Sequence, residues 1–433
     1  MQTAEQSELE FIDGGVTAPA GFTANGILCK IKERRTENDV ALIFSERPCS
    51  AAGLFTQNRV QAECVKLTKR NIADGRAQAV IANSGNANCC TGAQGAAAAE
   101  RMAQAAADAL AIRAEDVVVC STGVIGQQLP VERIEAKLPE LRAGLSKENH
   151  VEARTAIMTT DTQYKECAVR TSVGGRTVSV GAMCKGSGMI HINLGTMLSF
   201  ITTDCAISAP MLERALRESA AGTYNCVSID GDTSTNDTLI ILANGMAGNA
   251  EITADGADYQ AFRAALDEVN TIMAMKIAAD GEGATRLVEC TVSGAKDVPT
   301  ARGLAKEIIR SNLVKAAMFG KDANCGRILC AMGYSGFDFT PERTSVFFSS
   351  RPGAKRYFDS PGTPRVDGSE GGRTVEVIHD GVGLAFDEAA AERILGEESV
   401  AILVRLGDGT AEGRAWGCDL TYDYVKINGD YRT

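Results

Sequence analysis

Histidine is scarce in this chain: His150, His191 and His379 are the three among 433 residues, and aromatic residues make up only 5%. A Ser-His-Asp triad is hard to assemble from them, because the chain also lacks a GxSxG motif. No two of the 14 cysteines have the CxxC spacing of a zinc site or a dithiol motif. We therefore expect no metal, and we interpret most cysteines as small buried residues in a reducing compartment.

Positive charge is in the minority, since 44 lysines and arginines stand against 55 aspartates and glutamates, which gives a net charge of −11. This balance disfavours nonspecific binding to nucleic acids. The first ten residues are polar and acidic, unlike a signal peptide, and no apolar run is long enough to span a membrane. These features predict a soluble, cytoplasmic protein that has neither nucleic acid nor membrane as a partner.

Apolar runs typical of buried strands alternate with amphipathic or alanine-rich segments typical of helices. The predicted strands are Val40–Ser45, Ala79–Asn83, Val117–Cys120, Val178–Cys184, Met197–Thr202, Thr238–Ala243, Leu287–Ser293 and Val400–Leu406. The predicted helices are Gly95–Ile112, Val131–Gly144, Pro210–Thr223, Asp258–Ala279, Thr300–Phe319 and Asp387–Leu395. This alternation predicts α/β or α+β layers. The proline- and glycine-rich stretch Arg351–Gly372 predicts a long loop or linker.

A glycine and a hydroxyl residue, Gly195-Thr196, stand immediately before the apolar run Met197–Ile201. Glycine permits backbone angles closed to other residues, and the Thr196 Oγ atom could attack the Gly195 carbonyl. Hydrolysis of the resulting ester would leave Thr196 as a new N-terminus. Its α-amine, with a reference pKa of roughly 7.7–8.0, would be a base beside its own hydroxyl. A threonine that simply begins a buried strand fits the same pattern, so the residues alone leave both interpretations open.

A second candidate element is Thr122-Gly123, which follows the predicted strand Val117–Cys120. A glycine in such a turn lets backbone N–H groups face a developing negative charge, and the threonine hydroxyl adds a donor. An ordinary turn after a strand is the alternative.

Motifs along nearly the whole chain carry a resemblance to a known family. They are GGVTAPAGF (14–22), AAGLFTQNRV (51–60), NSGNANCCTG (83–92), CSTGVIGQQLP (120–130), IMTTDT (157–162), KGSGMI (185–190), DGDTSTNDT (230–238), GEGATRLVE (281–289), LVKAAMFGKDANCGRI (313–328) and the C-terminal DYVKINGDYRT. With these motifs in this order, the sequence resembles the ornithine acetyltransferase, or glutamate N-acetyltransferase, family. Members of that family cut their own chain before a threonine in a segment of this kind.

The resemblance implies a fold and an activity. The fold is an α/β body of sheets sandwiched between helices, with a smaller second domain and an N-terminal nucleophile that self-processing exposes. Self-cleavage would give an α chain of residues 1–195 and a β chain of residues 196–433, which remain associated as an α2β2 heterotetramer. The activity is transfer of acetyl from N2-acetyl-L-ornithine to L-glutamate in arginine biosynthesis, through an acetyl-Thr196 ester.

The resemblance also assigns the site residues. Thr196 is the nucleophile, Gly195-Thr196 the cleavage site, and Thr122 with Gly123 the oxyanion hole. Substrate contacts fall on Thr159, Lys185, Thr196, Glu282, Asn428 and Thr433. A lysine can pair with a carboxylate and a glutamate with an ammonium group, which suits an α-amino acid charged at both ends. No cofactor is implied, although acetyl-CoA is an alternative second acetyl donor, and His191 is expected to be structural.

Two motifs invite other interpretations. The segment that begins at Asp230 resembles a calcium loop, but Thr235 and Ile241 stand where the loop needs glycine and glutamate. The stretch 83–92 is rich in glycine but lacks the GK[ST] ending of a P-loop. Both motifs are expected to shape loops around the active site.

The sequence departs from the family's usual pattern at Gly195, 191–194, Cys205 and Cys325. These departures bear on which substrates the enzyme accepts. Several functions remain open at this point. The enzyme could also use acetyl-CoA to acetylate glutamate, or it could act on another acyl amino acid. A self-cleaving amidase would pass the acyl group to water, and a binding protein would only hold the amino acid.

Overall fold

The structure is a computed structural model of the chain, and it describes residues 9–191, 197–350 and 374–430. The described residues fall into two compact units. The first draws on Met1–Gly186, Asn193–Tyr224 and Thr233–Met273, and the second, smaller unit on Ser187–Ile192, Asn225–Asp232 and Ala274–Thr433. Within these described ranges, none of the helices combines the length and the apolar character that crossing a bilayer takes.

The first unit is built on a nine-stranded sheet with the order β1-β6-β7-β9-β11-β3-β4-β5, in which β2 also pairs with β3. Its strands are β1 (Glu10–Phe11), β2 (Phe22–Ile27), β3 (Val40–Phe55), β4 (Arg76–Asn83), β5 (Val117–Ser121), β6 (Lys165–Val173), β7 (Arg176–Lys185), β9 (Leu198–Thr203) and β11 (Thr238–Ala243). The register of β3 against β4 shifts between Phe44 and Cys49. Side chains of β4 and β5 share one apolar core with side chains of β9 and β11, so the sheet turns back on itself along β3.

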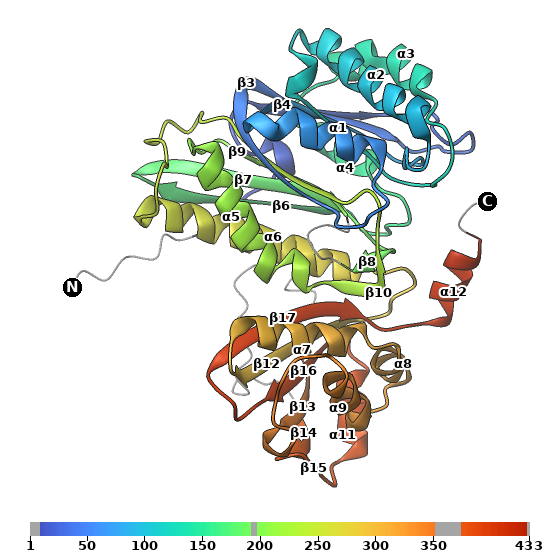
Figure 1. The fold of residues 1–433 in the computed structure, drawn as a ribbon, viewed down its shortest axis with the longest axis vertical. Coiled ribbons are helices and arrows are strands. Elements are labelled where there is room, and N and C mark those ends of the chain that lie inside the picture. The colour runs from blue at the N-terminus through green and yellow to red at the C-terminus, as the bar shows by residue number, and fades with distance from the viewer. Residues whose placement is uncertain (1–8, 192–196, 351–373, 431–433) are drawn as a thin grey trace. The chain divides into compact units, whose positions relative to one another are not determined.

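Helices cover both outer faces of this folded sheet (Figure 1). They are α1 (Glu63–Asn71), α2 (Gly92–Leu110), α3 (Val131–Ala143), α5 (Ala209–Gly222) and α6 (Ala257–Ala279). A further helix, α4 (His150–Ala156), instead contributes Ala153 and Ala156 to the inner core of the folded sheet. Apolar side chains of α1, α2 and α3 form a second core with β3, β4 and β5, and α5 packs on β3 and β11. The predicted arrangement of sheets between helices is therefore confirmed for this unit.

The second unit has a six-stranded sheet with the order β15-β14-β13-β16-β12-β17 and a small pair, β10-β8. Its strands are β8 (Ile190–His191), β10 (Ser228–Thr233), β12 (Leu287–Ala295), β13 (Ser345–Ser350), β14 (Thr374–His379), β15 (Val382–Gly383), β16 (Ser399–Arg405) and β17 (Ala411–Cys418). Its helices are α7 (Val298–Arg310), α8 (Asn312–Gly320), α9 (Cys325–Gly333), α11 (Glu388–Leu395) and α12 (Tyr422–Gly429). The buried faces of α7 and the sheet meet at β12 and β17.

One predicted helix is wrong. Thr300–Phe319 was expected to form a single helix, but α7 ends at Arg310 and α8 begins at Asn312. Ser311 between them has extended backbone angles, and its side chain accepts a hydrogen bond from the Val314 N–H, so it caps the second helix. The predicted loop Arg351–Gly372 lies outside the described residues.

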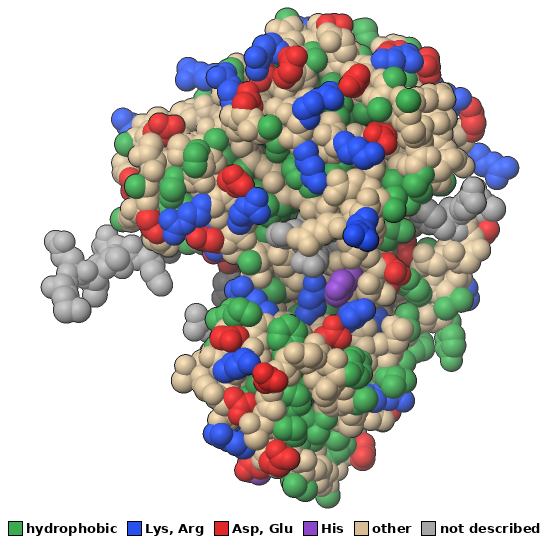
Figure 2. Space-filling view, viewed as in Figure 1, with side chains coloured by type: hydrophobic (Ala, Val, Ile, Leu, Met, Phe, Trp, Pro, Cys, Tyr) green, Lys and Arg blue, Asp and Glu red, His purple; other side chains and the backbone are tan. Residues whose placement is uncertain are grey.

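The surface and the cysteines agree with the composition. On the face shown in Figure 2, basic and acidic side chains are intermixed rather than gathered by sign. All cysteines lie in the described residues and all are free thiols; ten of them are buried, whereas Cys90 and Cys330 are exposed. The structure thus confirms the interpretation of most cysteines as buried apolar side chains.

Candidate active site

The predicted oxyanion residues lie directly after β5 in the first unit. The N–H of Thr122 donates to the Asn83 carbonyl at 2.9 Å, so this N–H already has a partner. The donor that Thr122 can offer to a substrate oxygen is therefore its hydroxyl. Gly123 has a φ of 134°, and a Cβ atom there would lie 2.3 Å from the Gly85 carbonyl carbon. Only glycine therefore fits where the chain passes the loop after β4.

A buried asparagine connects this loop to the start of β11. Asn236 Nδ2 donates to the Ser121 carbonyl at 2.8 Å and to the Ala87 carbonyl at 2.5 Å. Ser121 in turn donates its hydroxyl to Asn83 Oδ1 at 2.7 Å. The motifs 83–92 and 230–238 therefore both contribute to the loops at the end of β5.

The strand that follows the predicted nucleophile lies in the middle of the same sheet. Gly195 and Thr196 are outside the described residues, but Leu198 opens β9, and all six residues of this strand are buried. Leu198 pairs with Lys185 of β7 on one side and with Thr238 of β11 on the other. Thr238 also donates its N–H to the Met197 carbonyl at 2.8 Å. The register thus places the predicted carboxylate-binding lysine opposite a residue two positions beyond Thr196.

Lys185 belongs to a buried charge cluster that sequence analysis missed. Its ammonium lies 3.9 Å from Asp161, which also pairs with Lys165 at 2.7 Å. Asp161 Oδ2 accepts the N–H of Thr159 at 3.1 Å, so the cluster includes two predicted substrate contacts, Thr159 and Lys185. Burial opposes ionisation of Asp161, but Lys185 and Lys165 together hold the pKa of its carboxyl below the usual range.

The second unit brings two further predicted contacts together. Glu282 is buried, and its Oε2 accepts a hydrogen bond from Asn428 Nδ2 of α12 at 2.7 Å. The Glu282 N–H donates to the Ser187 carbonyl at 2.9 Å. A Cβ atom at Gly188 would lie 2.2 Å from Glu282 Oε2, so a larger residue there would require the carboxylate to shift. The remaining predicted contact, Thr433, is outside the described residues.

His191 and Asp230 have structural partners in the second unit. His191 Nδ1 lies 3.1 Å from Ser228 Oγ. Burial, with the positive charges of Lys306 and Arg310, lowers the pKa of His191 to about 4. The Asp230 carboxylate accepts the N–H groups of Met189 at 2.6 Å and Ile190 at 2.8 Å. The first residue of the calcium-like motif therefore fixes the backbone of the KGSGMI segment.

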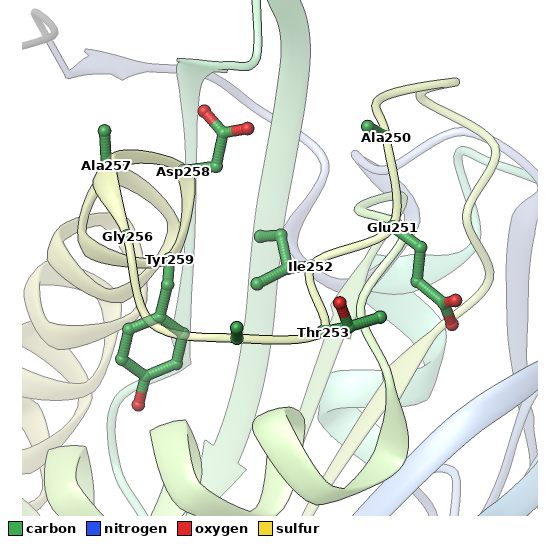
Figure 3. Close-up of a pocket in the computed structure, with 9 residues that line it drawn as sticks. Ala250, Glu251, Ile252, Thr253, Gly256, Ala257, Asp258 and Tyr259 are labelled. Atoms are coloured by element: carbon green, nitrogen blue, oxygen red, sulfur yellow. The ribbon is translucent and has the colours of Figure 1, made fainter.

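A pocket of about 330 Å³ lies elsewhere in the first unit (Figure 3). Its lining comes from one continuous stretch that leads into the first turn of α6 and includes Glu251, Asp258 and Tyr259. None of the predicted site residues lines it. In the ranges that the structure describes, no three His, Cys, Asp or Glu side chains gather as a metal-ligand set.

Acyl-transfer enzymes use an oxyanion donor and a residue that positions the substrate, which are the parts predicted here for the turn after β5 and for Lys185. The chain belongs to the ArgJ family, whose model matches residues 23–433. "Arginine biosynthesis bifunctional protein ArgJ" of Symbiobacterium thermophilum is 49% identical over 98% of this chain and 100% of its own length. The protein of the same name from Thermotoga neapolitana is 45% identical over 96% of this chain and 99% of its own length. This membership confirms the resemblance and the prediction of an acetyltransferase enzyme.

Solved structures of similar sequence exist for part of the chain. The Bacillus halodurans arginine biosynthesis bifunctional protein argJ is 38% identical, with a TM-score of 0.46 over 53% of this chain and 97% of that one. The Mycobacterium tuberculosis ornithine acetyltransferase, complexed with ornithine, is 39% identical, with a TM-score of 0.40 over 43% of this chain and 99% of that one.

Proposed function

We propose that this chain transfers acetyl from N2-acetyl-L-ornithine to L-glutamate through an ester on Thr196, after cutting itself between Gly195 and Thr196. The observation that carries the proposal is the full-length membership in the ArgJ family. The name of the Mycobacterium tuberculosis protein, an ornithine acetyltransferase complexed with ornithine, agrees with the proposed substrate.

In the first half-reaction, the α-amine of Thr196 accepts the proton of its hydroxyl while Oγ bonds to the acetyl carbon. The Thr122 hydroxyl and the Gly123 N–H stabilise the oxyanion. Collapse of the intermediate breaks the amide bond, and the ornithine amine leaves with the proton. In the second half-reaction, the glutamate amine attacks the acetyl ester and regenerates Thr196.

The charged side chains then position the two amino acids. Lys185 pairs with a carboxylate and Glu282 with an ammonium group, while Thr159, Asn428 and Thr433 supply neutral contacts. The chemistry needs neither a metal nor an organic cofactor. The two fragments are proposed to stay associated as an α2β2 heterotetramer.

A second candidate function adds acetyl-CoA as a donor for glutamate. The observation that favours it is the word "bifunctional" in the names of the relatives. Assays with acetylornithine alone, with glutamate added, and with acetyl-CoA in place of acetylornithine separate the functions. The proposal requires N-acetylglutamate and ornithine in equal amounts when both amino acids are present. Release of acetate without glutamate would instead indicate an amidase.

The pH dependence follows from the identity of the base. A general base acts only when unprotonated, so activity should be full above the pKa of the Thr196 amine and fall as the pH drops through it. His191 has a pKa of about 4 and is already neutral in that range. We expect the acidic limb of kcat/KM to persist unchanged in His191→Gln. An acidic limb that disappears in a folded and cleaved His191→Gln enzyme would contradict the assignment of the base.

The contact between Asn428 and Glu282 predicts a binding effect. Asn428→Ala removes a hydrogen bond to a buried carboxylate, which should raise KM for acetylornithine about five- to tenfold with a smaller change in kcat. Lys426→Ala is the matched control, because Lys426 lies on the same helix and, among the described residues, its ion pair is with Asp423 on the surface. Equal effects of the two substitutions would show that Asn428 acts on helix stability alone.

A further inference from the structure

We infer that Asp161 is a positioning residue that acts on the carboxylate of both amino-acid substrates through Lys185. The inference rests on the proposed function, which gives Lys185 the task of binding that carboxylate.

The two oxygens of the Asp161 carboxylate have different partners. Oδ1 accepts hydrogen bonds from the Gly186 N–H and from Lys165 Nζ, both at 2.7 Å. Oδ2 accepts the Thr159 N–H at 3.1 Å and faces Lys185 Nζ at 3.9 Å. One side chain therefore fixes the backbone at Thr159 and at the residue after Lys185.

The distance to Lys185 is the informative one. A separation of 3.9 Å is too long for a hydrogen bond, so Asp161 attracts the ammonium group without using its N–H donors. Within the described residues, the Lys185 side chain makes its polar contact with Asp161, through this ion pair. The Lys185 side chain is 9% exposed. The donors of a nearly buried ammonium are thus left for an oxygen atom of a ligand.

The charge of Asp161 keeps this arrangement stable. The side chains of Asp161 and Lys165 are 0% exposed, so the cluster lies away from solvent. If the Asp161 carboxylate were replaced by a neutral group, the ammonium groups of Lys165 and Lys185 would lie in a poorly solvated site without this negative charge. Loss of one partner from a buried ion pair leaves the other charge uncompensated, and the Lys185 ammonium would then move from its present position.

The substrates show why the position of Lys185 matters for both steps. In N2-acetylornithine the acetylated nitrogen and the carboxylate are attached to the same α-carbon, and in glutamate the attacking amine and the α-carboxylate are likewise. Because only the α-carbon separates the two groups, fixing the carboxylate also limits where the reacting nitrogen can lie. Lys185 lies opposite Leu198, two residues beyond Thr196, so this anchor can serve donor and acceptor alike.

A double-mutant cycle tests the inference. Asp161→Asn, Lys185→Met and the double variant are compared for kcat and for KM toward acetylornithine and glutamate. We expect Asp161→Asn to raise both KM values in parallel by about tenfold, with a smaller fall in kcat. The double variant should be no worse than Lys185→Met, because Asp161 acts through that lysine.

Asp204→Asn is the matched control for losing a buried carboxylate. Asp204 accepts the N–H groups of Ala20 at 3.0 Å and Ser179 at 2.8 Å, and it follows the opposite end of β9 from Leu198. Its substitution should cost stability in thermal unfolding but leave both KM values near those of the parent enzyme. A parallel rise of both KM values in this control would show that Asp161 has only the general role of a buried carboxylate.

The remaining outcomes separate the two proposals. A parent enzyme that does not transfer acetyl, or a Lys185→Met variant with unchanged KM, would contradict the proposed function. Unchanged KM values in Asp161→Asn, or effects that add fully to those of Lys185→Met, would overturn the inference about Asp161 alone. If Asp161→Asn does not fold, Asp161→Glu carries the test: it keeps the charge but moves it, and a KM equal to that of the parent enzyme would be the contradicting result.

Discussion

Replacing Thr196 by alanine should leave one uncut chain and lower acetyl transfer by at least about a thousandfold, because the same hydroxyl serves self-cleavage and catalysis. In the described residues, β9 begins two positions after Thr196, and it is fully buried and paired on both sides. Gel electrophoresis and the glutamate-dependent assay measure both losses on one preparation.

Thr196→Ser is the matched variant for this experiment. It keeps a hydroxyl at the same position and should retain cleavage and measurable transfer. N-terminal sequencing of the active parent enzyme should find a fragment that begins at Thr196. An active enzyme without that terminus would contradict the role of Thr196 in both steps.

Gly123→Ala should lower kcat by about a hundredfold or more, on the scale of losing one oxyanion donor. The reason is steric: a methyl group at this position would meet the backbone of Gly85 and Asn86, at 2.3 and 2.5 Å, and φ of 134° is itself unfavourable for alanine. Relief of the clash must move the Thr122-Gly123 turn away from its present geometry. Steady-state kinetics with acetylornithine measures the effect.

Gly126→Ala is the control that the same loop offers. Gly126 also has a positive φ, 82°, but no atom lies within 4 Å of a Cβ atom built there. Both variants share the cost of a strained backbone angle, and only Gly123→Ala disturbs the turn. Equal losses of kcat in the two variants would show that the loop's conformation, not its oxyanion geometry, is responsible.

Strands were predictable where an apolar run is bounded by polar or turn residues. β11 was predicted with its observed bounds, and β5, β7, β9 and β12 were found within two residues of their predicted ends. β3 continues ten residues beyond the predicted end at Ser45, through the polar residues Glu46 and Arg47 and through Pro48. The structure instead continues the strand past a shift in its pairing with β4.

The predicted helix over Thr300–Phe319 failed for a different reason. Apolar residues continue at helical spacing on both sides of Ser311, so the periodicity gives no sign of a break. The break depends on the extended backbone of Ser311 and on its cap to Val314. A capping serine inside an apparently continuous pattern is a local signal that periodicity overrides.

Sequence analysis named candidate site residues but not the contacts that these residues make. Lys185 and Glu282 came from the family resemblance, and the structure gives each a partner, Asp161 and Asn428. Asp161 was present in the IMTTDT motif, but a single aspartate among threonines in a loop has no periodicity. Its contacts become visible only in the structure, where β6 and β7 bring Lys165 and Lys185 to the same carboxylate.

The central claim is that acetyl is carried on Thr196, and intact-mass spectrometry of the cleaved protein tests it most directly. After mixing with acetylornithine alone, the fragment that begins at Thr196 should gain the mass of one acetyl group, and the other fragment should not change. Addition of glutamate should remove that mass and release N-acetylglutamate. Turnover with no acetylated fragment under any quench condition, or an acetyl group on the other fragment, would contradict the account.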